Sequence, residues 1–175
     1  MAEKFWAGAN LEPKRQHRWL LLMSGVPSFV VKTAAKPSYA INNTEHKYFG
    51  HTFNYPGNVT WNPVDVTLVD PIDPDTSKGL QTVLLNSGYD NPDARLELNS
   101  EGLFTVSKQE AVNALGGIIT LQQIGTRNNK PNQILEEWDM HNPWIEKVDF
   151  GKLDYSSDAM VDISMTIRYD YAILR

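Results

Sequence analysis

Near the end of the chain, apolar and polar residues alternate strictly. From Val161 to Tyr171 every second residue is apolar or aromatic, and the residues between them are polar or charged. A period of two indicates a β-strand with one buried and one polar face. The run predicts a strand of about eleven residues, roughly twice the average length. Such a strand fits either the core of a sandwich or a strand that continues into a partner subunit.

The residues before this strand predict its hairpin partner. Val148-Asp149-Phe150 is a short alternation that Gly151 breaks, and residues 155–158 have turn-forming side chains. The sequence therefore predicts a C-terminal hairpin within residues 138–173, with two large tryptophan side chains beside it. The predicted core residues are Trp138, Trp144, Val161, Ile163, Met165 and Ile167.

Other segments have strand or helix patterns. Alternation or β-branched residues predict strands over residues 18–24, 29–34, 59–70, 118–124 and 133–140, with 125–132 as a hairpin loop. Asp75 or Thr76 can cap a helix over residues 77–87. Ser107 and Glu110 have the spacing of a capping box, which predicts a second short helix up to the glycine pair at 116–117.

These elements indicate a β-rich α+β fold. We expect one domain over residues 1–175, a two-sheet antiparallel β-sandwich or barrel of about seven to nine strands with one or two short flanking helices. Residues 1–16 have no sustained period. They fit an N-terminal arm that lies on a neighbouring surface, or a partly ordered terminus.

Residues 39–57 mix aromatic and polar side chains and are interpreted as an extended inter-subunit loop. We expect two short strands joined by protruding backbone and closed by a turn at residues 55–58. A mixture of aromatic and polar residues suits protein–protein contact, although a solvent loop with incidental aromatic residues has the same composition. The candidate contact residues are Tyr39, Asn42, Asn43, Thr44, Glu45, His46, Lys47, Tyr48 and Phe49.

Composition and charge narrow the function. The chain has 21 acidic residues against 16 lysines and arginines, and its net charge of −5 argues against nucleic-acid affinity. It contains no cysteine, which excludes disulfides and thiolate metal sites and fits synthesis in a reducing cytosol. The longest apolar run, Trp19–Met23, is too short to span a bilayer, so we expect no membrane binding by the chain itself.

The sequence contains few signs of catalysis. It has no nucleophile elbow, zinc-protease motif, P-loop or Rossmann glycine pattern. Glu136 and Glu137 are adjacent in a predicted strand and must point to opposite faces. His46 and His51 have no third ligand at metal-site spacing. We therefore expect no enzyme activity, no cofactor and no metal.

The C-terminal run Trp138–Asp158, together with the strand that ends in Arg168-Tyr169-Asp170-Tyr171, resembles the C-terminal signature of phage tail tube proteins. The similarity is to the T4-like tail tube family of contractile-tail bacteriophages. In Asn142-Pro143-Trp144 the proline precedes the aromatic residue instead of following it, which departs from the family pattern. Weaker similarity covers Gly25-Val26-Pro27 and residues 61–70.

This resemblance implies a structural protein of the virion. Its family forms hexameric rings whose inner strands join in one barrel, and the rings stack into a hollow conduit for genome delivery. The implied partners are further copies of the chain, the tail sheath protein, the tape-measure protein, and baseplate and tail-terminator proteins. DNA passes through the lumen without specific binding. The implied location is the tail tube of the virion, assembled in the host cytoplasm.

Two other interpretations stay open. A baseplate tube initiator or a secretion or injection tube protein shares the fold, and a monomeric ligand-binding β-barrel or small hydrolase is a less favoured alternative. For a tube, we expect a polar lumen of negative or near-neutral charge. Lys32 and Lys36 then either pair with acids or face away from the lumen. The lumen-facing candidates are Lys32, Lys36, Ser38, Thr120 and Gln122.

Overall fold

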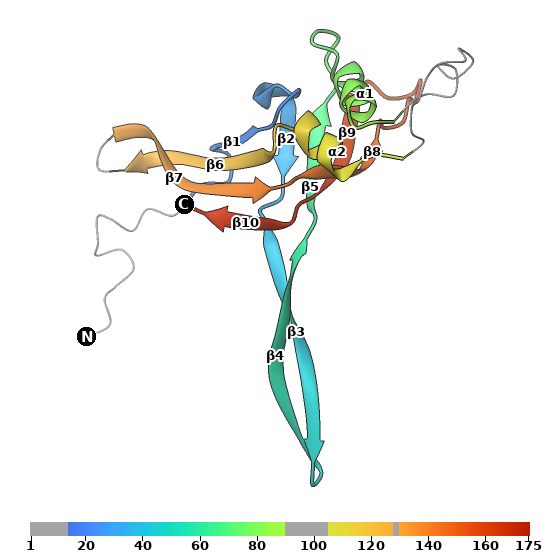
Figure 1. Ribbon diagram of the computed structural model, residues 1–175. Helices are drawn as coiled ribbons and strands as arrows, with labels where there is room; N and C mark the ends of the chain where they lie inside the picture. Colours follow the sequence, from blue (N-terminus) through green and yellow to red (C-terminus); the bar gives the residue numbers. More distant parts are fainter. Residues whose placement is uncertain (1–13, 90–104, 128–129) are drawn as a thin grey trace.

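The computed structural model describes residues 14–89, 105–127 and 130–175. A β-sandwich body carries two helices, and one long hairpin projects from it (Figure 1). The expectations for residues 1–13 of the N-terminal arm and for residues 90–104 lie outside the described residues. The elements are β1 (Trp19–Leu22), a 3-10 turn (Ser28–Val30), β2 (Val31–Ala34), β3 (Ser38–Tyr48), β4 (His51–Asn62), β5 (Val64–Val69), α1 (Thr76–Asn86), α2 (Lys108–Ala114), β6 (Ile118–Arg127), β7 (Lys130–His141), β8 (Trp144–Asp149), β9 (Asp162–Arg168) and β10 (Tyr171–Leu174).

The body consists of two four-stranded sheets. One has the strand order β1-β6-β7-β10 and the other β2-β5-β9-β8, while β3 and β4 pair only with each other among the described residues. Every strand pairing is antiparallel. This arrangement confirms the predicted β-rich α+β sandwich. The described part of the chain has ten strands, somewhat more than expected, because the strands predicted over residues 59–70 and 161–171 are each divided.

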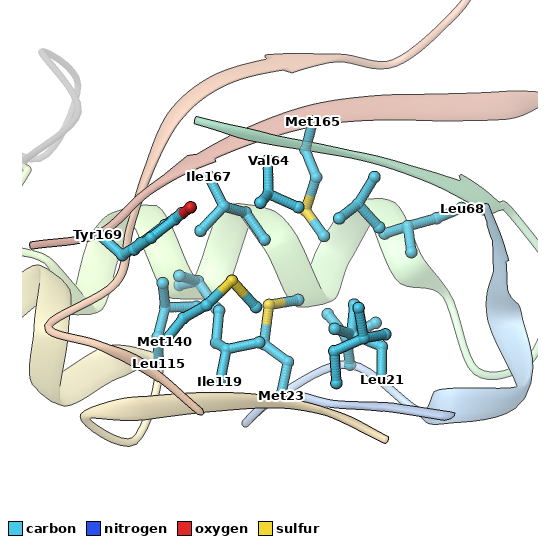
Figure 2. Packing of buried hydrophobic residues seen from close by; sticks show 14 of the residues in the cluster. Leu21, Met23, Val64, Leu68, Leu115, Ile119, Met140, Met165, Ile167 and Tyr169 are labelled. Carbon is cyan, nitrogen blue, oxygen red and sulfur yellow. The ribbon is translucent and has the colours of Figure 1, made fainter. Parts of the chain in front are cut away.

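The core lies between the two sheets, and alternation along the strands fills it. From one sheet, β5 and β9 direct apolar side chains inward, and the other sheet supplies those of β1, β6 and β7 (Figure 2). Ile163, Met165 and Ile167 of β9 are at most 2% exposed. Trp138, Trp144 and Val161 are only partly buried. Trp144 begins the edge strand β8 and Val161 precedes β9, whereas Trp138 lies in the inner strand β7. The expected burial therefore holds for the middle of the final strand and is incomplete at its margins.

The single long strand predicted over residues 161–171 is wrong. The chain leaves the second sheet after Arg168 and enters the first sheet at Tyr171, so β9 and β10 belong to different sheets. The inward positions run to Tyr169 and then resume at Ala172, one residue out of phase. The alternation in the sequence continues to Tyr171, but Tyr171 is 44% exposed, so the sequence pattern does not mark the corner. The residues predicted as one strand thus belong to two shorter strands in different sheets.

Polar contacts hold this corner in place. The Lys108 ammonium donates to both carboxylate oxygens of Asp170 at 2.8 and 2.9 Å, and Asn142 Nδ2 donates to the same carboxylate at 2.9 Å. The hydrogen bonds from Lys108 and Asn142 lower the pKa of Asp170. The Asp170 backbone N–H also donates to the His141 carbonyl at 3.0 Å. The start of α2, the end of β7 and the corner are thus joined at one carboxylate.

Both predicted helices are confirmed within one or two residues. Asp75 caps α1, because its side chain accepts a hydrogen bond from the Lys78 backbone N–H at 2.9 Å. Ser107 is the N-cap residue of α2, but its side chain makes no capping hydrogen bond, so the predicted capping box does not form. The predicted strand over residues 29–34 begins late, because residues 28–30 form a 3-10 turn.

Candidate assembly surfaces

The hairpin β3–β4 is the most exposed part of the described chain. Its strands have 11 and 12 residues, and all of their side chains are exposed except the partly buried Trp61. At about 3.3 Å per residue the hairpin is roughly 35 Å long. Figure 1 shows it projecting away from the sandwich on the side opposite α1. An isolated two-stranded ribbon is only marginally stable in water, so this surface is suited to contact with a partner.

The sequence-based description of residues 39–57 requires correction. The two strands are long and paired up to the tip, and they do not enclose a protruding loop. The turn consists of Phe49 and Gly50, with φ of +48° and +78°, which are the positive values that a tight two-residue hairpin requires. Residues 55–58, expected to form the closing turn, lie inside β4.

A β-bulge explains why Pro56-Gly57 resembled a turn. The register passes from Ile41–Val59 to Asn43–Pro56, so β4 has an additional residue at this point. A Cβ at position 57 would lie 3.0 Å from the backbone oxygen of Asn42, so glycine fits this close approach. Proline is tolerated because the outer edge of β4 has no partner strand among the described residues.

The two halves of the hairpin expose apolar side chains on opposite faces. Cross-strand partners share a face, so Tyr39–Trp61 and Ile41–Val59 form an apolar face near the body. Side chains alternate between the two faces along β3, so Tyr48, seven positions after Ile41, lies on the face opposite Ile41. Phe53 and Tyr55 share the face of Tyr48, because they pair with His46 and Thr44. These exposed outer residues are Tyr48, Phe53 and Tyr55.

Aromatic packing attaches the hairpin to the core. The Tyr39 and Trp61 rings meet edge to face with centroids 5.3 Å apart, and Trp61 lies 6.0 Å from Tyr169. Tyr169 is 8% exposed, and burial raises its pKa. Asn62 Nδ2 also donates to Ser38 Oγ across the first pair of the hairpin, at 3.0 Å. Ser38, a predicted lumen residue, is thus at the base of the hairpin.

Thr120 and Gln122 lie on the outward face of the β1-β6-β7-β10 sheet with two carboxylates. Thr120 Oγ1 donates to Asp139 at 2.8 Å, and Gln122 Nε2 donates to Glu137 at 2.6 Å. The Arg175 guanidinium lies 2.9 Å from the second oxygen of Asp139. The two acids lie at the centre of this face, and sequence reasoning did not assign them to it. The face is mixed, because Leu20, Leu22 and Ile173 are their exposed neighbours across the strands.

Lys36 lies on the other side of this sheet. It donates to Glu136 and to Gln123 Oε1, both at 2.8 Å. Glu136 also accepts hydrogen bonds from Lys14 and from the Trp138 indole. Burial opposes ionisation of Glu136, but these hydrogen bonds outweigh it and lower its pKa from 4.5 to about 2. Glu136 and Glu137 therefore do lie on opposite faces.

The predicted lumen residues do not form one surface. Lys32 pairs with Asp162 of β9 at 2.5 Å, so both candidate lysines contact acids of the same chain. Thr120 and Gln122 share the outward face, whereas Lys32, Lys36 and Ser38 lie elsewhere. These ion pairs join residues 100 or more positions apart, and no local pattern reveals them.

The described residues provide no obvious metal site. No group of three or more histidines and acids in this part of the chain is placed to hold a metal ion. In the same part of the chain, neither helix has the length and apolar character needed to cross a membrane.

Chains of contractile injection systems have a similar fold. A chain of the 6-fold symmetrised anti-feeding prophage (AFP) baseplate matches with a TM-score of 0.61 at 13% identity, covering 94% of this chain and 96% of that chain. A chain of the AFP tube-terminating cap has a TM-score of 0.62 at 15% identity, with 100% and 99% covered. A chain of the PVC sheath/tube terminator in its extended state has a TM-score of 0.57 at 16% identity, and the match covers 94% of this chain and 97% of that chain.

These matches define the class of fold. They extend over nearly the whole of both chains, and at such low identity they show the fold alone. No protein-family model matches the sequence, and no curated protein matches it. The chain thus has the fold of components of contractile injection systems.

Proposed function

We propose that this protein is a structural tube subunit of a contractile bacteriophage tail, and not an enzyme. Copies form hexameric rings, and the rings stack into a hollow conduit. The observation that carries this proposal is the long exposed hairpin with aromatic residues on both of its faces. The fold shared with chains of a 6-fold baseplate and a tube-terminating cap supports it.

Unpaired sheet edges support ring formation. Within the described residues, β1 and β10 are the outer strands of their sheet, and each has one edge without a partner strand. Such edges expose backbone N–H and C=O groups that favour pairing with another chain, and closing a barrel removes them. Edge-to-edge pairing of neighbouring copies would join these sheets around a ring.

We further propose that the outward face of this sheet lines the conduit. Its centre carries Thr120 and Gln122, which are hydrogen-bonded to Asp139 and Glu137. Carboxylates at the centre of the wall repel phosphate groups, and the face lacks the cationic stripe that would bind DNA and release counterions. Exposed Leu20, Leu22 and Ile173 make the rest of the wall partly apolar. Lys32 and Lys36 contact acids of their own chain and lie away from this face, so they add no cationic charge to it.

In this proposal the partners are those of a tail tube. They are further copies of the chain, the sheath protein that surrounds the tube, the tape-measure protein inside it, and the baseplate and tail-terminator proteins at its ends. The protein resides in the virion after assembly in the host cytoplasm. DNA passes through the conduit without specific binding.

A second candidate is a tube or tube-initiator protein of an injection or secretion system. The similarity to the PVC chain favours it, because that structure is named as an extracellular contractile injection system. The least favoured candidate is a monomeric ligand-binding protein or hydrolase, which would use a cavity such as those of about 690 and 740 Å3.

Light scattering after gel filtration, combined with negative-stain microscopy, tests the proposal. We expect rings and open tubes at high protein concentration. The matched variant lacks residues 43–46 and 53–56, which pair with one another, and it keeps the Phe49-Gly50 turn. We expect this variant to fold but to form no tubes. A wild-type protein that remains strictly monomeric would contradict the proposal.

A further inference from the structure

A cavity of about 740 Å3 lies where the first sheet extends beyond the second. The middle strands of the first sheet, β6 and β7, have 10 and 12 residues, whereas the longest strand of the second sheet, β9, has 7. Figure 1 shows β6 and β7 continuing past β2. The second sheet therefore does not cover the inner face of the first sheet at this end.

The walls of the cavity continue the core but do not close it. Along the inner face of the first sheet, the pair Leu121–Trp138 is followed by the pair Gln123–Glu136, and Trp19 of β1 lies opposite Gln123. Trp19 and Trp138 are only partly buried and pack against the edge of the core cluster. Both tryptophans thus line a space that the described residues leave empty.

The charged groups around the cavity have a small positive excess. Three lysines and one glutamate line it, namely Lys14, Lys32, Lys36 and Glu136. Lys14 and Lys36 both contact Glu136, and Lys32 contacts Asp162 just outside the lining. Three positive and two negative charges leave one positive charge in excess. An occupant with large apolar groups and one excess negative charge complements these walls.

The N-terminal arm joins the described structure at the wall of this cavity. Lys14 is the first described residue and contacts Glu136, and the carbonyl of Arg15 accepts a hydrogen bond from Gln123 Nε2 at 3.1 Å. Residue 13 is bonded to Lys14, so the preceding segment leaves from the cavity wall. Eight residues of extended chain span up to about 27 Å, which is enough for residue 6 to fold back into the cavity.

The sequence of the arm has the chemistry that the cavity requires. Residues 2–13 contain Glu3 and Glu12 against Lys4 alone, which is an excess of one negative charge. They also contain two adjacent aromatic residues, Phe5 and Trp6. Such side chains bury large apolar areas, and the indole N–H of a tryptophan can donate to a polar group at the rim.

We propose that Phe5 and Trp6 fold back into this cavity and complete the core of the same copy. A short flexible tether gives the arm an effective concentration in the millimolar range at its own cavity. At low protein concentration the arm of the same copy is therefore favoured over the arm of another. This inference does not depend on the proposed function, because it concerns single copies.

Disulfide formation in dilute, monomeric protein tests this contact, since the chain has no native cysteine. The test variant is Ala7→Cys with Thr33→Cys, which places one thiol beside Trp6 and one at an exposed position of the cavity wall. The matched control is Ala7→Cys with Asn113→Cys, because Asn113 is exposed on α2, which lies before the opposite end of β6. Both are oxidised with glutathione disulfide, and the remaining free thiols are counted by maleimide labelling and mass spectrometry.

We expect the test variant to lose its free thiols at least about tenfold faster than the control while it stays monomeric, because docking raises the local concentration of one thiol at the other. Adding Phe5→Ser and Trp6→Ser to the test variant should lower its rate to that of the control. Equal rates in the test variant and the control would overturn the proposal. Disulfide-linked dimers would also overturn it, because they would place the arm on another copy.

Amide hydrogen exchange on the cysteine-free chain gives a second measurement that does not require the thiol variants to fold. Phe5→Ser with Trp6→Ser should raise exchange in β1 and β2, which contribute to the cavity wall, and leave α2 unchanged. Ala7→Ser with Ala9→Ser keeps both aromatic residues and should match the wild type. Equal exchange in β1 and β2 of the wild type and the Phe5/Trp6 variant would overturn the docking proposal and leave the tube function intact.

Discussion

Truncation of Met165 tests the packing between the sheets. Met165 is 2% exposed in β9, which lies between β5 and β8. Figure 2 shows its side chain pointing into the layer of core residues with Val64 and Leu68. Met165→Ala removes three buried heavy atoms and leaves a cavity, and such changes cost about 2–5 kcal/mol. We expect the upper half of this range, because side chains from both sheets enclose the site and limit its collapse.

Urea unfolding followed by tryptophan fluorescence measures this loss, and the five tryptophans give a strong signal. With an m-value of about 2 kcal/mol/M, a loss of about 4 kcal/mol lowers the unfolding midpoint by about 2 M. Met160→Ala is the matched control, because Met160 is 71% exposed. Its effect should stay within about 0.5 kcal/mol. Equal effects of the two substitutions would refute the register that places Met165 in the core.

Three further predictions concern the surfaces. Trp61→Ala should destabilise the base of the hairpin, because it removes the ring contacts with Tyr39 and Tyr169. Amide hydrogen exchange should then rise more in β3 and β4 than in β6, and an equal rise in all three strands would contradict this. The pKa of Glu136 is lowered from 4.5 to about 2, so its ion pairs stabilise the folded protein fully above pH 4.5, and this stabilisation is lost as the pH falls toward 2. Glu136→Gln should remove that part of the pH dependence of the free energy of unfolding, and an unchanged pH dependence would count against the ion pairs. Thr120→Lys with Gln122→Lys should leave assembly intact but retard DNA release from assembled particles, and unaffected release would argue against this face as the channel wall.

Much of the fold follows from local patterns in the sequence. Sequence patterns located β5, β6, β7 and the capping residue of α1. The hairpin loop expected over residues 125–132 was wrong, because β6 continues to Arg127 and β7 begins at Lys130. The corner at Asp170 was not visible, because the alternation resumes after a slip of a single residue. The hydrophobic period indicates which face of a strand is buried, but it does not indicate which sheet the strand joins.

The candidate surfaces were less predictable from sequence. Aromatic and polar residues at 39–57 did indicate an exposed segment, but Pro56-Gly57 resembled a turn because a bulge and a turn favour the same residues. The pairing of Lys36 with Glu136 depends on contact across 100 positions. The exposure of Leu84 in α1, at 44%, was missed because an apolar stripe on a helix ordinarily indicates a buried face.

A cryo-EM map of the protein assembled at high concentration tests the central claim most directly. We expect stacked hexameric rings around an open channel, with the β3–β4 hairpin of each copy reaching the adjacent ring and Thr120 and Gln122 on the channel wall. Particles that contain only separate monomers, or rings whose hairpins extend into solvent and contact no other copy, would contradict the account.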